Sequence, residues 1–388
     1  MVNIRLLNKI SPEGLAQLDS TKYACSEEGS TEDQGIILRS ASMHDMDIPS
    51  HIRAIARAGA GVNNIPIDKC SQQGIVVFNT PGGNANAVKE MVMTGLLLSA
   101  RKVYPGMQWV QTLKGQPEVP KLVEKGKGKF VGPELMGKKL GVIGLGAIGV
   151  LVCNLAHHFG MEVYGYDPYL SIDSALKLTR SVHRVNSLKE IYSNCDFITL
   201  HVPLGKETKG MINSQSIATM KHGVRIMNFS RGELVETQDI LAALDEKNVY
   251  CYVTDFPNDD LLGHPGVLAL PHLGASTPES EDVCASMAAS QLRDFLENGN
   301  IKNSVNIPDL HMERTGGERV TLFHQNIPET LAKYTGVFAS HNINIRNLIN
   351  KSKGEYAYTV LDLDGHVPPA VLEQLEQAKG IIRVTLLK

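Results

Sequence analysis

Hydrophobic residues in the first 300 positions fall into two alternating patterns, short apolar runs and longer stretches of helical period. Apolar runs of strand length occur at residues 36–38, 74–78, 162–166, 197–200, 224–228, 249–253 and 267–270. The longest helical stretch, Asn86–Leu113, is expected to cross into the next domain, and Lys121–Lys129 is predicted to be a Lys/Gly-rich loop. Strands that alternate with helices predict an α/β fold with a doubly wound parallel sheet.

The pattern changes after Pro308, where the chain first becomes polar and rich in turn residues. Met312–Glu318 is predicted to be a linker. The chain beyond it predicts strands at 319–323, 343–351, 356–363 and 381–387 and helices at 328–339 and 368–378. This β-α-β-β-α-β order is that of the ferredoxin-like fold, so we expect a small separate domain at this end.

A glycine fingerprint follows an apolar strand in the middle of the chain and opens the predicted helix 147–159. Gly144, Gly146 and Gly149 match G-x-G-x-x-G, in which the glycines permit a tight turn, a close approach of pyrophosphate and close helix packing. The next strand ends at Asp167, about 20 positions on, where an acidic residue binds the ribose hydroxyls of NAD. No arginine adjoins Asp167 to receive a 2′-phosphate, so NAD is expected rather than NADP.

The position of the fingerprint predicts the order of the domains. More than a hundred residues precede it, so another domain is built first, and the predicted helix 279–297 returns to that domain. We therefore expect a Rossmann-type cofactor domain inserted in a second α/β domain, followed by the ferredoxin-like tail. The expected boundaries are 1–86 and 279–311 for the outer domain, 87–278 for the NAD-binding domain and 319–388 for the tail.

Composition and charge exclude several classes of protein. The net charge is −3 and the pI about 6.5, so no basic field favours nucleic acid or an anionic membrane. No apolar run reaches the roughly 20 residues of a membrane span, and the N-terminus lacks a signal-peptide pattern. The six cysteines are scattered, with neither a C-x-x-C pair nor a His/Cys cluster at metal spacing. A cytoplasmic protein without a metal is expected.

Two polar residues follow strand ends of the cofactor domain, where open α/β sheets bind their ligands. Arg231 comes after the strand 224–228, and a guanidinium can bind a carboxylate with two hydrogen bonds. His272 comes after the strand 267–270, and imidazole exchanges protons near neutral pH. Hydride transfer to a nicotinamide needs one such cation and one such acid/base. Weaker candidates on the fingerprint helix or after a strand are His157, His158 and His201.

Separated motifs in a consistent order carry a resemblance to a known family. They are the glycine fingerprint with Asp167, Asn228–Gly232 and Pro271–Thr277, and the runs Arg57–Asn64 and Asn79–Gly82 extend the match. On these motifs, almost the whole chain resembles the D-isomer-specific 2-hydroxyacid dehydrogenases, and Pro271–Thr277 is most similar to the branch that oxidises 3-phosphoglycerate. The tail resembles an ACT domain, the regulatory module that some members of that branch carry.

The resemblance implies roles for the residues at the strand ends. Arg231 would bind the substrate carboxylate and activate the carbonyl, and His272 would be the proton donor and acceptor. In the family an acidic residue partners this histidine, five positions after the aspartate of a D-V-F-x-x-E-P context. Here the segment from Asp255 reads D-F-P-N-D-D. Counting from Asp255 gives Asp260 and counting from the phenylalanine gives Asp259; we favour Asp260.

The resemblance also implies three binding sites. Residues expected around NAD are Gly144, Gly146, Ile148, Gly149, Asp167, Val202, Phe229, Ser230 and Asp255. A substrate phosphate is expected at Arg39, Ser40 and Arg57. The serine-binding positions of ACT-bearing relatives correspond to His324, Asn326 and Asn344, although Glu329 stands where those relatives usually have glycine.

Residues and resemblance together predict NAD-dependent oxidation of 3-phosphoglycerate to 3-phosphohydroxypyruvate, a step of serine biosynthesis. Two alternatives stay open: a dehydrogenase for another D-2-hydroxy acid, such as glycerate, lactate or 2-hydroxyglutarate, and an NAD-sensing binding protein without turnover. The expected partners are a small phosphorylated 2-hydroxy acid and L-serine as effector, with neither nucleic acid nor membrane. The long apolar helix and the tail both predict a homo-oligomer, either a dimer or a tetramer.

Overall fold

The computed structural model describes residues 1–387, which belong to two compact units. The outer unit contains residues 1–84 and the chain from Pro278 onward, and the inner unit contains Ala85–Thr277. Within residues 1–387, no helix combines the length and the apolar character that crossing a membrane requires.

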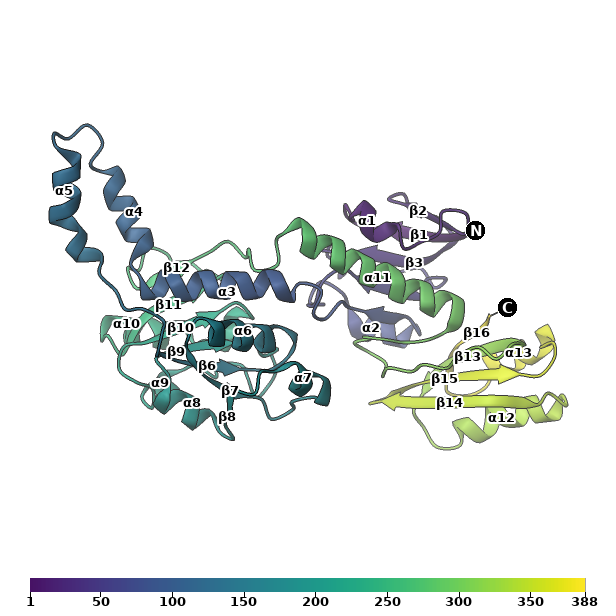
Figure 1. Cartoon of the computed structure of the whole chain (residues 1–388). Helices are drawn as coiled ribbons and strands as arrows, with labels where there is room; N and C mark the ends of the chain where they lie inside the picture. Colours follow the sequence, from purple (N-terminus) through teal and green to yellow (C-terminus); the bar gives the residue numbers. More distant parts are fainter. Residues whose placement is uncertain (388) are drawn as a thin grey trace. The chain divides into compact units, whose positions relative to one another are not determined.

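The inner unit is built on a parallel sheet of seven strands (Figure 1). They are β6 (Lys139–Ile143), β7 (Glu162–Tyr166), β8 (His183–Arg184), β9 (Phe197–Leu200), β10 (Val224–Asn228), β11 (Val249–Thr254) and β12 (Val267–Ala269). Their order across the sheet is β12-β11-β10-β9-β6-β7-β8, so the direction of strand addition reverses between β6 and β9. The central strands are buried and mostly apolar, as in parallel sheets that are covered on both faces.

The helices of the inner unit differ from the sequence prediction in two places. They are α3 (Ala85–Ala100), α4 (Val103–Gln111), α5 (Val119–Gly126), α6 (Ala147–His158), α7 (Ile172–Lys177), α8 (Leu188–Asn194), α9 (Ser214–Ile217) and α10 (Thr237–Asp245), with a 3-10 turn at Gly232–Leu234. The single helix predicted for 86–113 is wrong, because the chain breaks at Lys102 between α3 and α4. Pro105 explains the break, since proline fits the first turn of a helix but not its interior.

The predicted loop at residues 121–129 is also wrong, because this segment is helical in α5 and in the 3-10 turn Lys127–Phe130. Trp109 of α4 packs against both: its ring lies 5.2 Å from that of Phe130, and a Cβ on Gly126 would lie 2.3 Å from it. A tertiary contact therefore orders a segment whose own residues favour a loop. In Figure 1, α4 and α5 form an arm that projects from the sheet of the inner unit.

The outer unit contains a parallel sheet of five strands in the order β2-β1-β3-β4-β5. The strands are β1 (Val2–Leu6), β2 (Tyr23–Ser26), β3 (Asp33–Leu38), β4 (Ala54–Arg57) and β5 (Val76–Phe78), with helices α1 (Pro12–Leu15), α2 (Ile67–Gln72) and α11 (Pro278–Asn298). The predicted return helix is α11, which packs on β3, β4 and α1. A Cβ on Gly14 would lie 2.2 Å from the Cβ of Ala285, so glycine is required where α1 crosses α11.

The tail has the predicted order of elements and forms a separate antiparallel sheet. Its elements are β13 (Glu318–Gln325), α12 (Thr330–Ser340), β14 (Ile345–Lys353), β15 (Tyr356–Leu363), α13 (Pro369–Glu376) and β16 (Ile381–Leu387), and the strand order is β14-β15-β13-β16. Helices α12 and α13 pack on one face of this sheet around Tyr334 and Phe338. Phe323 and Tyr358 on the other face join the core that contains Phe295 of α11.

Candidate active site

The carboxyl ends of the inner-unit strands are in register along one edge of the sheet. Paired positions run through Tyr166, Ile143, Leu200, Asn228, Thr254 and Ala269, on β7, β6, β9, β10, β11 and β12 in turn. The glycine fingerprint follows β6, and Arg231, Asp255 and His272 follow β10, β11 and β12. The fingerprint, Arg231, Asp255 and His272 therefore share one edge, at the reversal of strand order where such sheets bind ligands.

The backbone requires two of the three fingerprint glycines, and the third leaves space beside the first turn of α6. Gly144 has a φ of +94°, and a Cβ there would lie 2.4 Å from the carbonyl oxygen of His201. A Cβ on Gly149 would lie 1.9 Å from the carbonyl oxygen of Gly144. Gly146, the N-cap of α6, has open space where a Cβ would point and provides no side-chain cap. The first amides of α6 can therefore donate to a phosphate oxygen, and this turn fits the pyrophosphate of NAD.

Asp167 is fixed by two backbone amides beside this turn. Its Oδ2 accepts a hydrogen bond from the N–H of Leu145 at 2.8 Å, and its Oδ1 accepts one from the N–H of Tyr169 at 2.8 Å. The side chain is half-buried, and each carboxylate oxygen keeps a second acceptor site. These sites fit the ribose hydroxyls of NAD.

The other predicted cofactor residues lie in different surroundings. Val202 lies against Gly144, and Ile148 is half-buried in the first turn of α6. The hydroxyl of Ser230 donates to the carbonyl of Leu200 at 2.7 Å. The ring of Phe229 is buried in the core under α3, so Phe229 can face a cofactor only through its backbone.

His201 is unsuited to proton exchange at neutral pH. Its Nε2 lies 3.0 Å from the hydroxyl of Thr199, and its Nδ1 is buried without a hydrogen-bond partner in the described part of the chain. Burial lowers the pKa of His201 to about 3, so the ring stays neutral.

The loop that carries Arg231 is fixed by a buried amide. Asn228 is fully buried; its Nδ2 donates to the carbonyl of Arg231 at 2.8 Å, and its Oδ1 accepts from the N–H of Ser230 at 3.1 Å. The half-buried guanidinium of Arg231 donates from Nη1 to the carbonyl of Ser230 at 2.6 Å. A guanidinium has five N–H donors, so this contact leaves capacity for a substrate carboxylate.

Asp255 is the buried carboxylate at this edge. Its side chain is 1% exposed, its Oδ2 accepts from the N–H of Gly274 at 3.1 Å, and its Oδ1 has no hydrogen-bond partner within residues 1–387. Burial raises the pKa of Asp255, while the Gly274 N–H and the charges of His272 and Arg231 oppose that rise. Arg231 and His272 therefore lie close enough to Asp255 for a positive charge on either to stabilise the ionised carboxylate.

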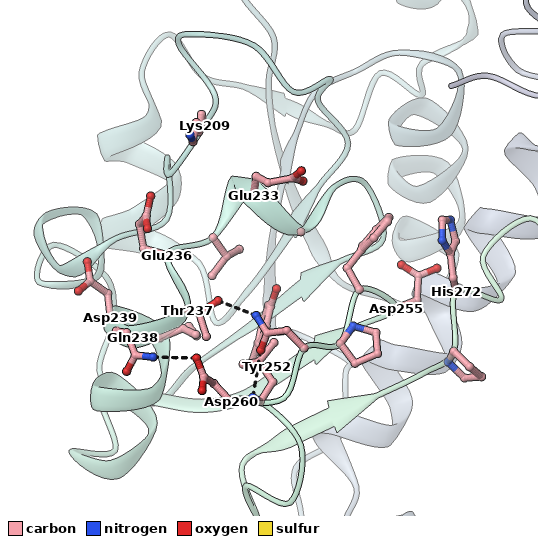
Figure 2. A pocket seen from close by; sticks show the side chains of 18 residues that line it. Lys209, Glu233, Glu236, Thr237, Gln238, Asp239, Tyr252, Asp255, Asp260 and His272 are labelled. Carbon is pink, nitrogen blue, oxygen red and sulfur yellow. Dashed lines mark hydrogen bonds between the residues drawn. The ribbon is translucent and has the colours of Figure 1, made fainter. Parts of the chain in front are cut away.

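His272 is an exposed residue in a constrained backbone conformation. Its φ is +50°, its N–H donates to the carbonyl of Leu270 at 3.1 Å, and its ring lies 4.7 Å from that of Phe256. Figure 2 shows His272 beside Asp255 at one side of a cleft of about 1020 Å³. Left-handed backbone in a residue other than glycine is concentrated at functional sites, and this exposed imidazole can exchange protons with a small molecule.

The structure does not bring Asp260 to His272. Asp260 is exposed, and its Oδ2 accepts a hydrogen bond from Gln238 of α10 at 3.0 Å. Figure 2 shows this pair in another part of the cleft, away from His272. Asp259 is exposed as well. The physical reason is the turn after β11, which directs the chain toward α10, whereas Asp255 directly follows the strand.

Sequence reasoning assigned Asp255 to the cofactor and did not foresee its place beside His272. A usable signal was present, because Asp255 follows β11 as Arg231 follows β10 and His272 follows β12. The strand-end rule that selected the two cations therefore selects this carboxylate equally well.

The predicted phosphate residues lie in the outer unit after β3 and β4. Arg39 and Ser40 follow β3, and Arg57 is the last residue of β4. The Nε of Arg57 donates to the carbonyl of Arg39 at 3.1 Å, and the guanidinium of Arg39 forms an ion pair with Glu281 of α11 at 2.5 Å. The structure thus gathers both arginines, together with a carboxylate that the sequence did not predict.

The predicted effector residues do not converge within one tail. Asn326, after β13, donates to the carbonyl of Gly354, whereas Asn344, before β14, donates to Asp364 at the opposite end of the sheet. His324 is 2% exposed and lies 2.9 Å from the hydroxyl of Thr359, inside the tail. Asn326 and Asn344 therefore belong to opposite ends of the sheet, with His324 buried between its strands and α12.

The chain matches known proteins along its whole length. Residues 93–274 match the model for the D-isomer specific 2-hydroxyacid dehydrogenase, NAD binding domain. The chain is 35% identical to the D-3-phosphoglycerate dehydrogenase of Methanocaldococcus jannaschii over 72% of this chain and 53% of that protein. It is 30% identical to the D-3-phosphoglycerate dehydrogenase of Escherichia coli over 100% of this chain and 95% of that protein. The chain therefore spans about half the length of the first relative and nearly all of the second.

Solved structures agree with these relatives. The NAD+-bound 3-phosphoglycerate dehydrogenase of Entamoeba histolytica superposes with a TM-score of 0.62 at 27% identity, over 80% of this chain and 99% of that chain. The D-mandelate dehydrogenase of Rhodotorula graminis has the same fold, with a TM-score of 0.67 at 20% identity over 80% and 98% of the two chains. The expected NAD-binding domain is confirmed, and the chain belongs to the D-isomer specific 2-hydroxyacid dehydrogenase family.

Proposed function

We propose that this chain oxidises 3-phosphoglycerate to 3-phosphohydroxypyruvate with NAD. The observation that carries the proposal is the edge of the inner sheet, where Arg231, Asp255 and His272 follow the ends of three adjacent strands. The NAD-binding turn lies on the same edge, and the relatives named D-3-phosphoglycerate dehydrogenase support the choice of substrate.

Three side chains would carry the chemistry. Arg231 binds the carboxylate of the hydroxy acid and places positive charge beside the oxygen at C2. A ring nitrogen of His272 accepts the proton of the C2 hydroxyl as the carbonyl forms. NAD, held by the glycine turn and Asp167, supplies the hydride acceptor when bound. In the reverse direction His272 returns the proton to the carbonyl oxygen.

Asp255 would provide the carboxylate partner of His272 that the sequence prediction assigned to Asp260. The support is its burial beside His272 and Arg231, in contrast with the exposed contact of Asp260 to Gln238. A buried negative charge stabilises the imidazolium that forms as the hydroxyl proton is taken up. The comparison of Asp255→Asn with Asp260→Asn tests the assignment, because only the first substitution is expected to change the pH dependence of kcat.

Phosphate binding would belong to Arg39, Ser40 and Arg57. The Arg57 guanidinium donates to the backbone carbonyl of Arg39, which places two arginines at the ends of β3 and β4. Two guanidinium groups suit a phosphate dianion better than they suit a singly charged carboxylate. An acid without a phosphate, such as D-glycerate or D-lactate, gains nothing from this pair. The pair therefore favours the phosphorylated substrate over the other D-2-hydroxy acids.

The tail would be an ACT-like regulatory domain, and L-serine would be its effector. Because Asn326 and Asn344 lie at opposite ends of one sheet, a site that uses both needs the tails of two copies.

Helix α4 also supports an oligomer, since none of its residues is buried and Val103, Tyr104, Met107 and Val110 are each more than 40% exposed. We propose that α4 packs against a second copy, and sedimentation of the Met107→Glu variant tests this.

The test of function is NADH formation by the purified protein with 3-phosphoglycerate, beside D-glycerate, D-lactate and D-2-hydroxyglutarate. Activity selective for the phosphorylated acid is expected. Activity only with an unphosphorylated acid would keep Arg231 and His272 in their roles and remove the phosphate assignment. NAD binding without turnover, in the wild type as in His272→Asn, would identify an NAD-sensing protein instead.

A further inference from the structure

The backbone around Arg39 is held by an unusual concentration of hydrogen bonds. Asn8, which follows β1, accepts with its single Oδ1 from the N–H groups of Arg39 at 3.3 Å, Ser40 at 3.1 Å and Ala41 at 2.8 Å. Three consecutive amides that converge on one oxygen fix the turn after β3.

The carbonyl of Arg39 is held as firmly as its amide. It accepts from the Nε of Arg57 at 3.1 Å and from the Nδ2 of Asn64 at 3.2 Å, and Asn64 also donates to the carbonyl of Ala41 at 2.7 Å. The Cα of Arg39 is therefore anchored on both sides. Its long side chain is the part of this loop that can exchange partners.

In the structure the partner of that side chain is Glu281. The Nη1 of Arg39 lies 2.5 Å from the Oε1 of Glu281, in the first turn of α11, and the two side chains are 36% and 43% exposed. Ion pairs this accessible to water contribute little net stability, so another anion can replace the carboxylate. The predicted phosphate site thus contains its own competing anion.

We propose that Glu281 determines specificity by competing with the substrate phosphate for Arg39. The inference rests on the proposed function, because it concerns the phosphate site of that substrate. A phosphate dianion carries more charge than the Glu281 carboxylate and more acceptor oxygens, so it displaces Glu281. Anions of lower charge do not displace Glu281, so Glu281 limits binding at Arg39 to ligands that carry a phosphate dianion.

Glu281 also lies where any carboxylate stabilises a helix, so its competing role must be separated from this one. Glu279 provides the matched control. It is exposed in the same first turn of α11, and no ion pair of Glu279 is found within residues 1–387. Glu279→Gln removes the same charge from the same helix end without touching Arg39.

The experiment compares full-length wild type with Glu281→Gln, Glu279→Gln, Arg39→Gln and the double variant Arg39→Gln/Glu281→Gln. We expect Glu281→Gln to lower both the KM for 3-phosphoglycerate and the Kd for inorganic phosphate about two- to five-fold, the size typical of an exposed ion pair. The change should appear in KM far more than in kcat. Glu279→Gln should leave both constants unaltered, and Glu281→Gln should have no effect once Arg39 is replaced.

Three outcomes of the comparison between variants would overturn the inference, and a fourth concerns phosphate binding itself. One is a rise in KM and in the phosphate Kd of Glu281→Gln, which would mean that Glu281 orients Arg39 for binding. The others are an equal effect of Glu279→Gln and an effect of Glu281→Gln that persists without Arg39. Calorimetry with inorganic phosphate separates this inference from the proposed function, because it reports competition at Arg39 even if 3-phosphoglycerate is not turned over. Phosphate binding by none of the variants would also overturn it.

Discussion

Two buried aspartates in this protein differ in how fully their carboxylate oxygens are paired. Asp362 of the tail is 2% exposed and Asp255 of the inner unit is 1% exposed. Asp362 forms a bidentate pair with Arg319, through Nε at 2.6 Å and Nη2 at 3.1 Å. Asp255 accepts one backbone hydrogen bond and keeps a buried oxygen without a partner among the described residues.

Every N–H donor of Arg319, the cation of the tail pair, has a hydrogen-bond acceptor. Arg319 is fully buried, and besides Asp362 it donates to the carbonyls of Asn298, Met312 and Glu313, which uses all five of its N–H groups. These bonds join the end of α11, the linker and β13. The tail pair therefore has a structural role, whereas the acceptor capacity left on Asp255 is typical of a site where charge changes during function.

Breaking the tail pair is expected to give the largest effect on stability. Asp362→Asn leaves the guanidinium of Arg319 buried without its counter-charge, which typically costs about 3–5 kcal/mol. Hydrogen exchange of the β13 and β15 amides measures this, since a loss of about 3 kcal/mol speeds exchange more than a hundred-fold where local opening is involved.

The control lies two residues further along the chain. Asp364 pairs with Arg346 at the surface, and both side chains are about 40% exposed. Asp364→Asn should therefore cost far less stability than Asp362→Asn, because exposed ion pairs are screened by water. Equal acceleration of exchange in the two variants would contradict a special role for the buried pair.

The same contrast shows how far the sequence could predict the molecule. The inner sheet and the tail follow from local pattern, since hydrophobic period and turn residues specify a strand or helix at each place. Gly144 and Gly149 were predictable because a steric requirement at a single position selects glycine. The positions of Arg231 and His272 were predictable because both follow strand ends, and their roles stay predictions.

What could not be predicted depends on contacts between distant segments. The helical state of α5 depends on Trp109, and the partner of Arg39 depends on α11 returning to β3 more than two hundred residues later. The predicted partner of His272, Asp260, contacts Gln238 instead, because of the way the chain leaves β11. A sequence count cannot reveal the direction of that turn, because its contacts are with α10, where Thr237 accepts a hydrogen bond from Asn258 and Gln238 donates one to Asp260.

The second prediction is a stabilising substitution, whereas Asp362→Asn is expected to destabilise the protein. Asp255→Asn removes a buried, incompletely paired charge, so we expect it to stabilise the inner unit by about 1 kcal/mol at pH 7. It should also reduce kcat/KM about a hundred-fold, because His272 loses its carboxylate neighbour. Hydrogen exchange of the β11 amides and initial rates measure the two effects. Asp260→Asn is the control, and a destabilised Asp255→Asn would show that this aspartate is structural.

The smallest expected effect is the different way in which the stability contributions of Asp362 and Asp255 change as the pH falls. Burial would raise the pKa of Asp362, but the hydrogen bonds and charge of Arg319 outweigh it and lower that pKa, so the stability from Asp362 persists until the pH falls below about 4. The pKa of Asp255 is raised by burial, so the cost of its charge is present at neutral pH and disappears as the pH falls through that raised value. We therefore compare the free energy of unfolding of each variant with that of the wild type between pH 7 and pH 4. As the pH falls, the gain in stability of Asp255→Asn should shrink, while the loss of stability of Asp362→Asn should stay constant. Exchange rates of β11 and β15 amides at several pH values, each corrected for intrinsic exchange, measure both. If the loss of stability of Asp362→Asn disappeared at a higher pH than the gain of Asp255→Asn, the raised pKa would belong to the tail carboxylate and not to Asp255.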